Sequence, residues 1–88
     1  MNDTDELFDF PCDFPVKVMG RQDASFEAHV VMIARRHFPD LGEGAVRSRA
    51  SRNGNYLAVT VTVRAENRAQ LDAFYRELTA DAAVLMVL

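Results

Sequence analysis

The sequence predicts a single α+β domain whose elements follow one another as strand, helix, strand, strand, helix, strand. Three observations support this prediction. Alternating or continuous apolar residues typical of strands occupy residues 14–20, 45–52, 56–65 and 83–88. Between them, two segments repeat their apolar residues at helical spacing. The chain has 88 residues, 49% of them hydrophobic, which suits one domain with a core of its own.

A short turn joins the first strand to the first helix. The turn begins at Gly20, and Asp23 is predicted to be the N-cap of a helix over residues 25–38. Pro39 ends this helix, because proline has no N–H to donate. Side chains at helical spacing form one stripe that is expected to face the core. They are Phe26, Val30, Ile33 and His37.

The two middle strands, residues 45–52 and 56–65, are predicted to form a hairpin. The turn between them is Asn53-Gly54-Asn55, and these residue types tolerate the positive φ of tight turns. Side chains alternate along both strands, so that one face of the hairpin is apolar and the other is polar. The apolar face of the longer strand carries Leu57, Val59, Val61 and Val63.

The second helix is predicted to begin after Asn67, whose spacing to Gln70 matches a capping box. The last strand, residues 83–88, is apolar at almost every position, so only one of its faces can meet the helices. The apolar stripe of the second helix is Leu71, Phe74, Tyr75 and Leu78.

Right-handed crossovers and one tight hairpin arrange these elements as a ferredoxin-like β-α-β-β-α-β two-layer sandwich. We expect a four-stranded antiparallel sheet in the order 4-1-3-2, with two helices on one face. The second and fourth strands are then the edges of the sheet. Arginines on the second strand suit an exposed edge, whereas the apolar fourth strand requires a cover or a partner.

Charge divides the chain into an arm and a body. Residues 1–13 hold five acids and no Lys or Arg, whereas residues 14–88 hold eight acids and ten bases, a formal charge of +2. We interpret residues 1–13 as an acidic and apolar N-terminal arm and residues 14–88 as the single domain. Leu7, Phe8 and Phe10 are too apolar for a free tail, so we expect them to pack against the domain or a neighbouring subunit.

The residue types present argue against several kinds of chemistry. Cys12 is the only cysteine, which excludes an intramolecular disulfide and a thiolate zinc cluster and suits a reducing compartment. The acidic N-terminus is unlike a secretory signal, and no apolar stretch is long enough for a bilayer, so we expect a cytoplasmic protein without membrane contact. His29 and His37 lack the i, i+4 spacing of a metal pair, and we predict no metal site. No acid–base pair or nucleophile motif is present either, so we predict a chain that is not an enzyme and uses no cofactor.

Five blocks of the sequence resemble a known family: FPCDFPVKVMG, ARRHFP, SRNGNYLAVTVTV, QLDAFYREL and VLMVL. In this order and spacing they are similar to the YbeD-like family of small uncharacterised bacterial proteins, over nearly the whole chain. The resemblance implies a ferredoxin-like fold similar to ACT-type regulatory domains, such as the one in phosphoglycerate dehydrogenase. It also implies a link to the lipoate pathway, by association of neighbouring genes alone, and it implies no catalytic residues.

The similarity to ACT-type domains points to a ligand site at the first turn. Such domains bind small molecules such as amino acids near this turn, often across a dimer interface. Glycine permits close approach of the backbone, and the N–H groups at a helix start attract carboxylates. The candidate ligand-binding residues are Gly20, Arg21 and Asp23, and the alternative is an ordinary glycine turn followed by an aspartate cap.

A candidate interaction surface lies on the sheet face opposite the helices. On this face the last strand should lie beside Lys17 and Met19, and the two middle strands present basic and polar side chains. The surface is thus apolar on one side and basic on the other. We expect it to meet a second copy in a homodimer or to be crossed by the acidic arm. Its candidate residues are Met19, Arg47, Arg49, Arg64 and Met86.

These observations favour a non-enzymatic regulatory or adaptor module that acts by protein–protein contact with an unknown partner, with a small-molecule effector as in ACT-type domains. The alternative is an RNA- or single-strand-binding domain that uses a strip of arginines. RNA-recognition domains of this topology stack bases on outward aromatic residues, whereas Thr60 and Thr62 stand at those positions here. A third hypothesis is an enzyme whose site forms only between subunits. The strip comprises Arg47, Arg49, Arg52 and Arg64.

Overall fold

The computed structural model describes residues 9–88 and contains the predicted strands and helices in the predicted order. The helices are α2 (Phe26–His37) and α3 (Arg68–Ala80). A short 3-10 helix, Glu43–Ala45, precedes the second strand. The strands are β1 (Cys12–Arg21), β2 (Val46–Ala50), β3 (Tyr56–Ala65) and β4 (Val84–Val87).

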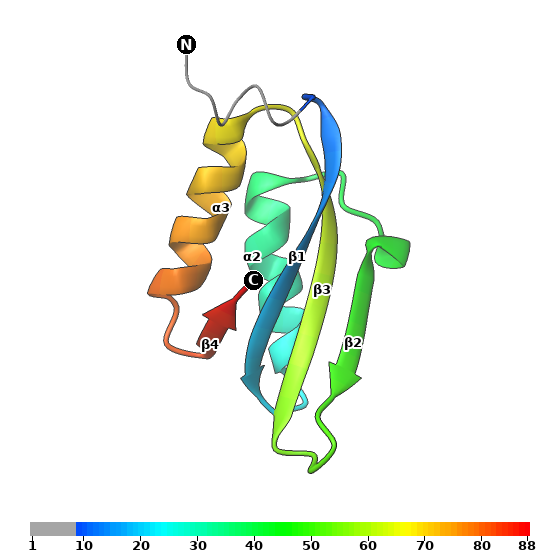
Figure 1. Cartoon of the computed structure of the whole chain (residues 1–88), viewed down its shortest axis with the longest axis vertical. Helices are drawn as coiled ribbons and strands as arrows, with labels where there is room; N and C mark the ends of the chain where they lie inside the picture. Colours follow the sequence, from blue (N-terminus) through cyan, green and yellow to red (C-terminus); the bar gives the residue numbers. More distant parts are fainter. Residues whose placement is uncertain (1–8) are drawn as a thin grey trace.

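The four strands form one antiparallel sheet in the order β2-β3-β1-β4. The long central strands β1 and β3 pair from Cys12↔Ala65 to Arg21↔Tyr56. Both helices lie on one side of the sheet, and β2 and β4 are its edges (Figure 1). The ferredoxin-like sandwich and the strand order predicted from the sequence are confirmed. No helix of residues 9–88 lies on the other side of the sheet, and we call that side the open face.

The core lies between the sheet and the two helices. Phe74 of α3 is the largest of the fully buried side chains, and its ring meets Phe38 edge-on at 5.3 Å between ring centroids. The strands contribute every second residue, as expected for a sheet with one covered face. Their fully buried valines are Val16, Val18, Val59, Val61 and Val63.

The start of α3 confirms the predicted cap. The side-chain oxygen of Asn67 accepts a hydrogen bond from the Gln70 N–H at 2.9 Å. The Gln70 amide oxygen in turn accepts from the Glu66 N–H at 2.8 Å, one residue before the position used in a standard capping box. Its amide nitrogen donates to the His37 carbonyl at 2.8 Å, so the same side chain also joins the start of α3 to the end of α2.

The start of α2 differs from the prediction. The helix begins at Phe26, and its N-cap is Ser25, whose side chain makes no capping hydrogen bond. The Asp23 Oδ1 instead accepts hydrogen bonds from the Ser25 N–H and the Ser25 Oγ, both at 2.7 Å. The prediction that Asp23 caps the helix is therefore wrong, because its carboxylate closes the turn that precedes the helix.

The end of α2 carries His37, the last residue of the predicted stripe. His37 is half-buried, as expected for a residue at the end of the helix, and its imidazole lies against Glu77 of α3. Ala34 and Phe38 are buried beside it. The last turn of α2 packs beside α3 as well as over the sheet, so a polar side chain at this position has a polar partner.

Strand β1 begins at Cys12, two residues before the predicted start. Cys12 and Asp13 therefore belong to the sheet rather than to the predicted arm, since they pair with Ala65 and Arg64 of β3. Phe10 is half-buried and packs against the core, as predicted. The predicted packing of Leu7 and Phe8 concerns positions outside the described residues.

The hairpin between β2 and β3 contains a longer loop than predicted. β2 ends at Ala50 rather than at residue 52. Ser51 closes the loop twice, since its N–H donates to the Tyr56 carbonyl at 2.8 Å and its Oγ accepts from the Tyr56 N–H at 3.1 Å. Gly54 adopts the predicted left-handed conformation, with φ of 73°.

Candidate ligand cavity and interaction face

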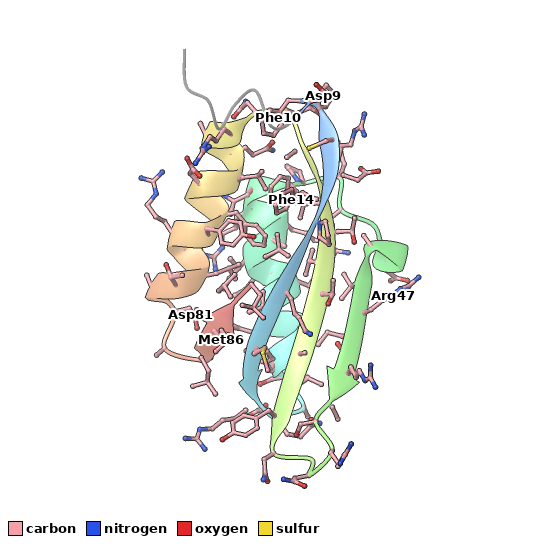
Figure 2. The ribbon with its side chains drawn as sticks, viewed as in Figure 1. Asp9, Phe10, Phe14, Arg47, Asp81 and Met86 are labelled. Carbon is pink, nitrogen blue, oxygen red and sulfur yellow. The ribbon has the colours of Figure 1, made fainter. Side chains whose placement is uncertain are left out.

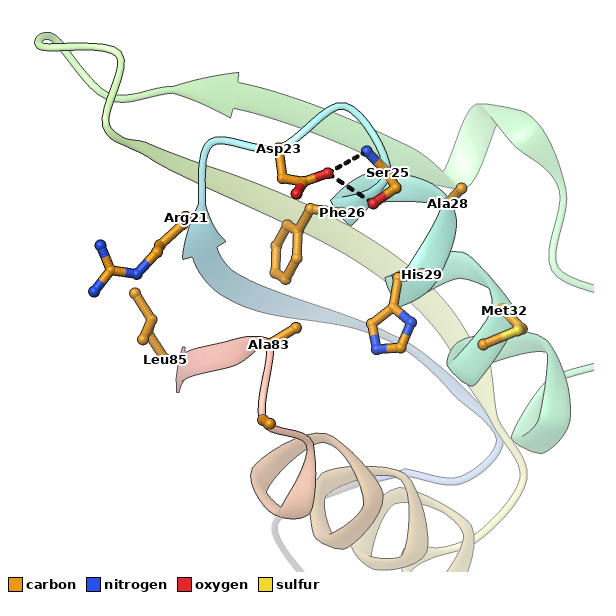
Figure 3. Close-up of a pocket in the computed structure, with 10 residues that line it drawn as sticks. Arg21, Asp23, Ser25, Phe26, Ala28, His29, Met32, Ala83 and Leu85 are labelled. Atoms are coloured by element: carbon orange, nitrogen blue, oxygen red, sulfur yellow. Dashed lines mark hydrogen bonds between the residues drawn. The ribbon is translucent and has the colours of Figure 1, made fainter.

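A cavity of about 570 Å³ opens beside the turn between β1 and α2. It lies between the first turns of α2 and the segment that enters β4, two regions far apart in the sequence (Figure 3). Arg21 and Leu85 stand at one end, and His29 and Met32 project from α2 toward the other (Figure 3). Most of the wall is apolar, and its apolar members are Phe26, Ala28, Met32, Ala82, Ala83 and Leu85.

The three predicted ligand-binding residues occupy different places around this cavity. Arg21 and Asp23 line it. Gly20 is buried and does not line it, because the Phe26 ring covers the glycine. A Cβ at this position would lie 2.4 Å from the ring and 2.8 Å from the Ala83 carbonyl oxygen. The glycine therefore permits Phe26 to pack close to the backbone of β1, and Phe26 forms the wall that a ligand would meet.

Asp23 and Arg21, the two charged residues that line the cavity beside the turn, differ in whether they already have a hydrogen-bond or ion-pair partner. Hydrogen bonds from the Ser25 hydroxyl and the Ser25 N–H lower the pKa of Asp23, so the carboxylate stays ionised and fixed in the turn. Arg21 is exposed and takes part in no ion pair with any residue that the structure describes. Arg21 is thus the group at this end that is able to receive an anion.

At the other end of the cavity, His29 and Asp81 form a pair that the sequence analysis missed. The His29 Nε2 and the Asp81 Oδ2 are 2.7 Å apart, and the two side chains are 33% and 21% exposed. The Asp81 Oδ1 accepts from the Ala83 N–H at 2.9 Å. That bond, and to a smaller extent His29, lowers the pKa of Asp81 against the opposing effect of partial burial. The pair fastens α2 to the segment between α3 and β4.

A second polar cluster holds the two helices together further along. The His37 Nε2 lies 2.7 Å from the Glu77 Oε1, and Arg36 donates to the Glu77 Oε2. Both histidines of α2 thus face a carboxylate from α3 or from the residue after it. No group of three or more His, Cys, Asp or Glu side chains suited to a metal ion occurs among residues 9–88.

The open face presents two rows of paired residues across the sheet. One row runs Met86, Met19, Ala58, Arg49 from β4 to β2. The next row runs Leu88, Lys17, Thr60, Arg47, where Leu88 and Lys17 exchange backbone hydrogen bonds of 2.8 and 3.1 Å. Arg47 and Met86 lie toward opposite edges of the sheet in Figure 2. The structure therefore brings together four of the five predicted interaction residues, with apolar groups on one side and basic groups on the other.

The fifth predicted interaction residue, Arg64, lies further along β3. Its Nη1 is 3.5 Å from the Asp13 Oδ1 on β1, and both side chains are exposed. An exposed ion pair of this kind contributes little to stability. Arg52, the remaining member of the basic strip, lies in the hairpin loop. It lines the same hollow of the open face as Arg47 and Arg49.

The open face is hollowed into a shallow channel of about 1,030 Å³ along β3. Ala58 and Thr60 form its low floor, because they are small residues flanked on each side by longer side chains. Four cations line the channel, and no acid does so within the described part of the chain. The cations are Lys17, Arg47, Arg49 and Arg52.

Comparison with known proteins assigns the chain to a family. A family model described as "Protein of unknown function (DUF493)" matches residues 5–88. The chain belongs to this family. A UPF0250 protein of Paraburkholderia phytofirmans is 44% identical over 84 residues, covering 96% of this chain and 94% of that protein. A UPF0250 protein of Chromobacterium violaceum is 47% identical over 83 residues, covering 94% and 93%. The resemblance to the YbeD-like family is thereby confirmed.

A solved structure also resembles the fold. The ACT domain from the GTP pyrophosphokinase of Chlorobium tepidum, determined in solution by NMR, has a TM-score of 0.65 and covers 86% of this chain and 84% of its own. Its sequence identity is 14%, so the similarity concerns the fold alone. The predicted similarity to ACT-type folds is confirmed. Within residues 9–88, none of the helices has the length and apolar character needed to cross a membrane.

Proposed function

We propose that this chain is a non-enzymatic regulatory module that acts by protein–protein contact and takes a small-molecule effector in the cavity between α2 and β4. The observation that carries this proposal is the cavity itself. Its volume of about 570 Å³ falls in the range of small-molecule sites, and its wall combines mainly apolar side chains with a few polar groups at the rim.

The chemistry of the wall favours an apolar molecule with one carboxylate. Arg21 offers a planar guanidinium that matches a carboxylate with two parallel hydrogen bonds. The apolar tail would lie along Phe26, Met32 and Leu85, where burial of apolar surface supplies affinity. Asp23, fixed as an anion beside Ser25, disfavours a second negative charge at the same end.

The position of the cavity supports coupling between an effector and a protein contact. Leu85 lines the cavity, and the next residue of the same strand, Met86, lies on the open face. Arg21 likewise belongs to β1 and pairs with the exposed Tyr56 on the open face. A ligand against Arg21 and Leu85 would therefore restrict the two strands that carry the apolar side of the open face.

Isothermal titration and thermal-shift screens test the effector. The panel comprises amino acids, nucleotides, and lipoic and octanoic acids, and we expect an apolar carboxylic acid to bind. Ala28→Leu fills the cavity from α2, and Arg21→Gln removes the anion receptor, so both should abolish or weaken that binding. The matched controls are Ala69→Leu and Arg35→Gln, exposed positions outside the cavity. Absence of binding across the panel, or equal losses in the controls, would contradict the effector part of the proposal.

The protein-contact part is tested separately by affinity capture from the native cytosol with mass spectrometry. A specific partner should be retained by the wild-type chain and lost from a variant altered on the open face, Met86→Ser. Ala69→Ser is the control, since Ala69 is exposed on α3 and lines neither the cavity nor the open face. If the same proteins are recovered with all three chains, no contact is made through the open face.

A further inference from the structure

We infer that the open-face channel binds an extended acidic peptide segment of another protein, with its carboxylates on the β2 side and its apolar side chains on the β4 side. This inference rests on the proposed function, which it deepens by naming the chemistry of the partner. It does not require the cavity to hold an effector.

The charge of the channel supplies the first argument. Its lining includes Lys17, Arg47, Arg49 and Arg52. Within residues 9–88 none of these four cations forms an ion pair. Four neighbouring cations that have no counter-charge among the described residues attract an anionic partner and raise its rate of association.

The spacing along the strands supplies the second argument. Arg47 and Arg49 are two residues apart on one strand, which places them about 7 Å apart on the same face. Carboxylates at positions i and i+2 of an extended peptide have the same spacing. The planar guanidinium groups can each take one carboxylate with two hydrogen bonds. The β2 side of the channel therefore matches a strand with an acid at every second position.

The opposite side of the channel supplies the third argument. Met19 lines the channel, and Met86 of β4 pairs with it and is 51% exposed. Leu88 continues this side and is 61% exposed. Side chains of an extended peptide alternate between its two sides, so the residues between the acids would face these apolar groups. Methionine adapts well to differently shaped apolar partners.

The width and floor of the channel fit one extended chain. β1 and β2 lie two strand spacings apart, about 10 Å, and small residues of β3, Ala58 and Thr60, leave the space between them low. A nucleic acid strand fits the charges as well but lacks stacking partners here. Tyr56 is the only aromatic residue among the channel residues that the structure describes.

Fluorescence anisotropy with three labelled probes tests the inference on the full chain. The probes are a ten-residue peptide of alternating glutamate and leucine, the same peptide with glutamine for glutamate, and a ten-nucleotide oligouridine. We expect the acidic peptide to bind most tightly, with an affinity that falls as salt rises from about 50 to about 300 mM. Tighter binding of the oligouridine, or equal binding of the glutamine peptide, would overturn the inference.

Two pairs of variants locate the binding surface. Arg47→Gln with Arg49→Gln should weaken binding by about tenfold or more, while Arg35→Gln with Arg76→Gln removes the same charge from the helical layer and should change it less than twofold. Met86→Ser should also weaken binding, and Ala69→Ser, at an exposed position on α3 outside the channel and the cavity, should not. Equal losses of affinity within either pair would overturn the inference. Self-association of the chain, detected by sedimentation velocity and preventing the peptide from binding, would also overturn it. Effector titrations report on the cavity, so failure of one proposal is distinguishable from failure of the other.

Discussion

Replacing Gly20 with alanine adds one methyl group where β1, α2 and the segment before β4 meet. The new Cβ would lie 2.4 Å from the Cε1 and Cζ of Phe26 and 2.8 Å from the Ala83 carbonyl oxygen. Carbon atoms in contact normally stay about 3.5–4.0 Å apart, so the ring would have to move by roughly 1 Å. Phe26 is 4% exposed and packed in the core, and the carbonyl belongs to backbone that leads into paired β4.

The expected cost follows from these contacts. Overpacking a core costs about 1–3 kcal/mol, and we place Gly20→Ala in the upper half of that range because one of the clashing atoms is backbone. Alanine also lowers the conformational entropy of the unfolded chain, which offsets about 0.4–1 kcal/mol of this cost. The net destabilisation is then about 2 kcal/mol, which lowers the melting temperature of a domain this size by roughly 8–16 °C.

Urea unfolding followed by circular dichroism measures this effect. Gly44→Ala is the control, since a Cβ there meets nothing within 4 Å and should leave the stability unchanged or slightly raised. Phe26→Leu in the Gly20→Ala background should recover part of the loss, with a coupling energy of about 1 kcal/mol or more. If Gly20→Ala unfolds at the same urea concentration as the wild type, or if the two substitutions are additive, the packing account of Gly20 is refuted.

Three further predictions concern charge, capping and the core. Asp81→Asn keeps the acceptor for the Ala83 N–H but removes the charge. Since the pKa of Asp81 is lowered in the fold, its stabilisation is present above the ordinary value of 3.8 and lost as the pH falls through the lowered pKa. Wild type and variant should thus differ in urea unfolding at pH 7 and converge in acid, and a constant difference would exclude this cause. Asn67→Ala removes the acceptor for the Gln70 N–H and should cost about 1 kcal/mol in the same assay, whereas an unchanged midpoint would show that the cap is replaceable. Phe74→Ala should lower the free energy of unfolding by about 3–5 kcal/mol and speed up amide hydrogen exchange throughout the core. A much smaller loss of stability would mean that neighbouring side chains fill the space left by the ring.

The candidate site was only partly predictable. Arg21 and Asp23 are predicted from the resemblance to ACT-type domains, which bind small molecules near the turn between the first strand and the first helix, and both line the cavity. His29 was considered only as a metal ligand, since its partner Asp81 is 52 residues away and nothing near either residue signals the pair. Met32 and Leu85 were also missed, because an exposed apolar residue on a helix or an edge strand carries no local sign of what it faces.

The sequence by itself determined the elements and most of the core. Val59, Val61 and Val63 alternate with polar residues, and all three are fully buried in β3 as predicted. Asn67 and Gln70 marked the start of α3 within one residue. These features are readable because the periods of strands and helices, and the caps of helices, depend on neighbours only a few residues away.

The tertiary structure decided what the surfaces present. The sequence predicts that β4 lies beside Met19, but the pairing of β4 with β1 shifts register after Met19, and no residue pattern marks that shift. Gly20 is predicted to let a ligand approach the backbone closely, whereas in the structure it is the Phe26 ring that covers the glycine. The cavity and the channel both arise where segments distant in the sequence pack together. Their shape depends on how the helices sit on the sheet and how the strands align, and local periodicity does not contain that information.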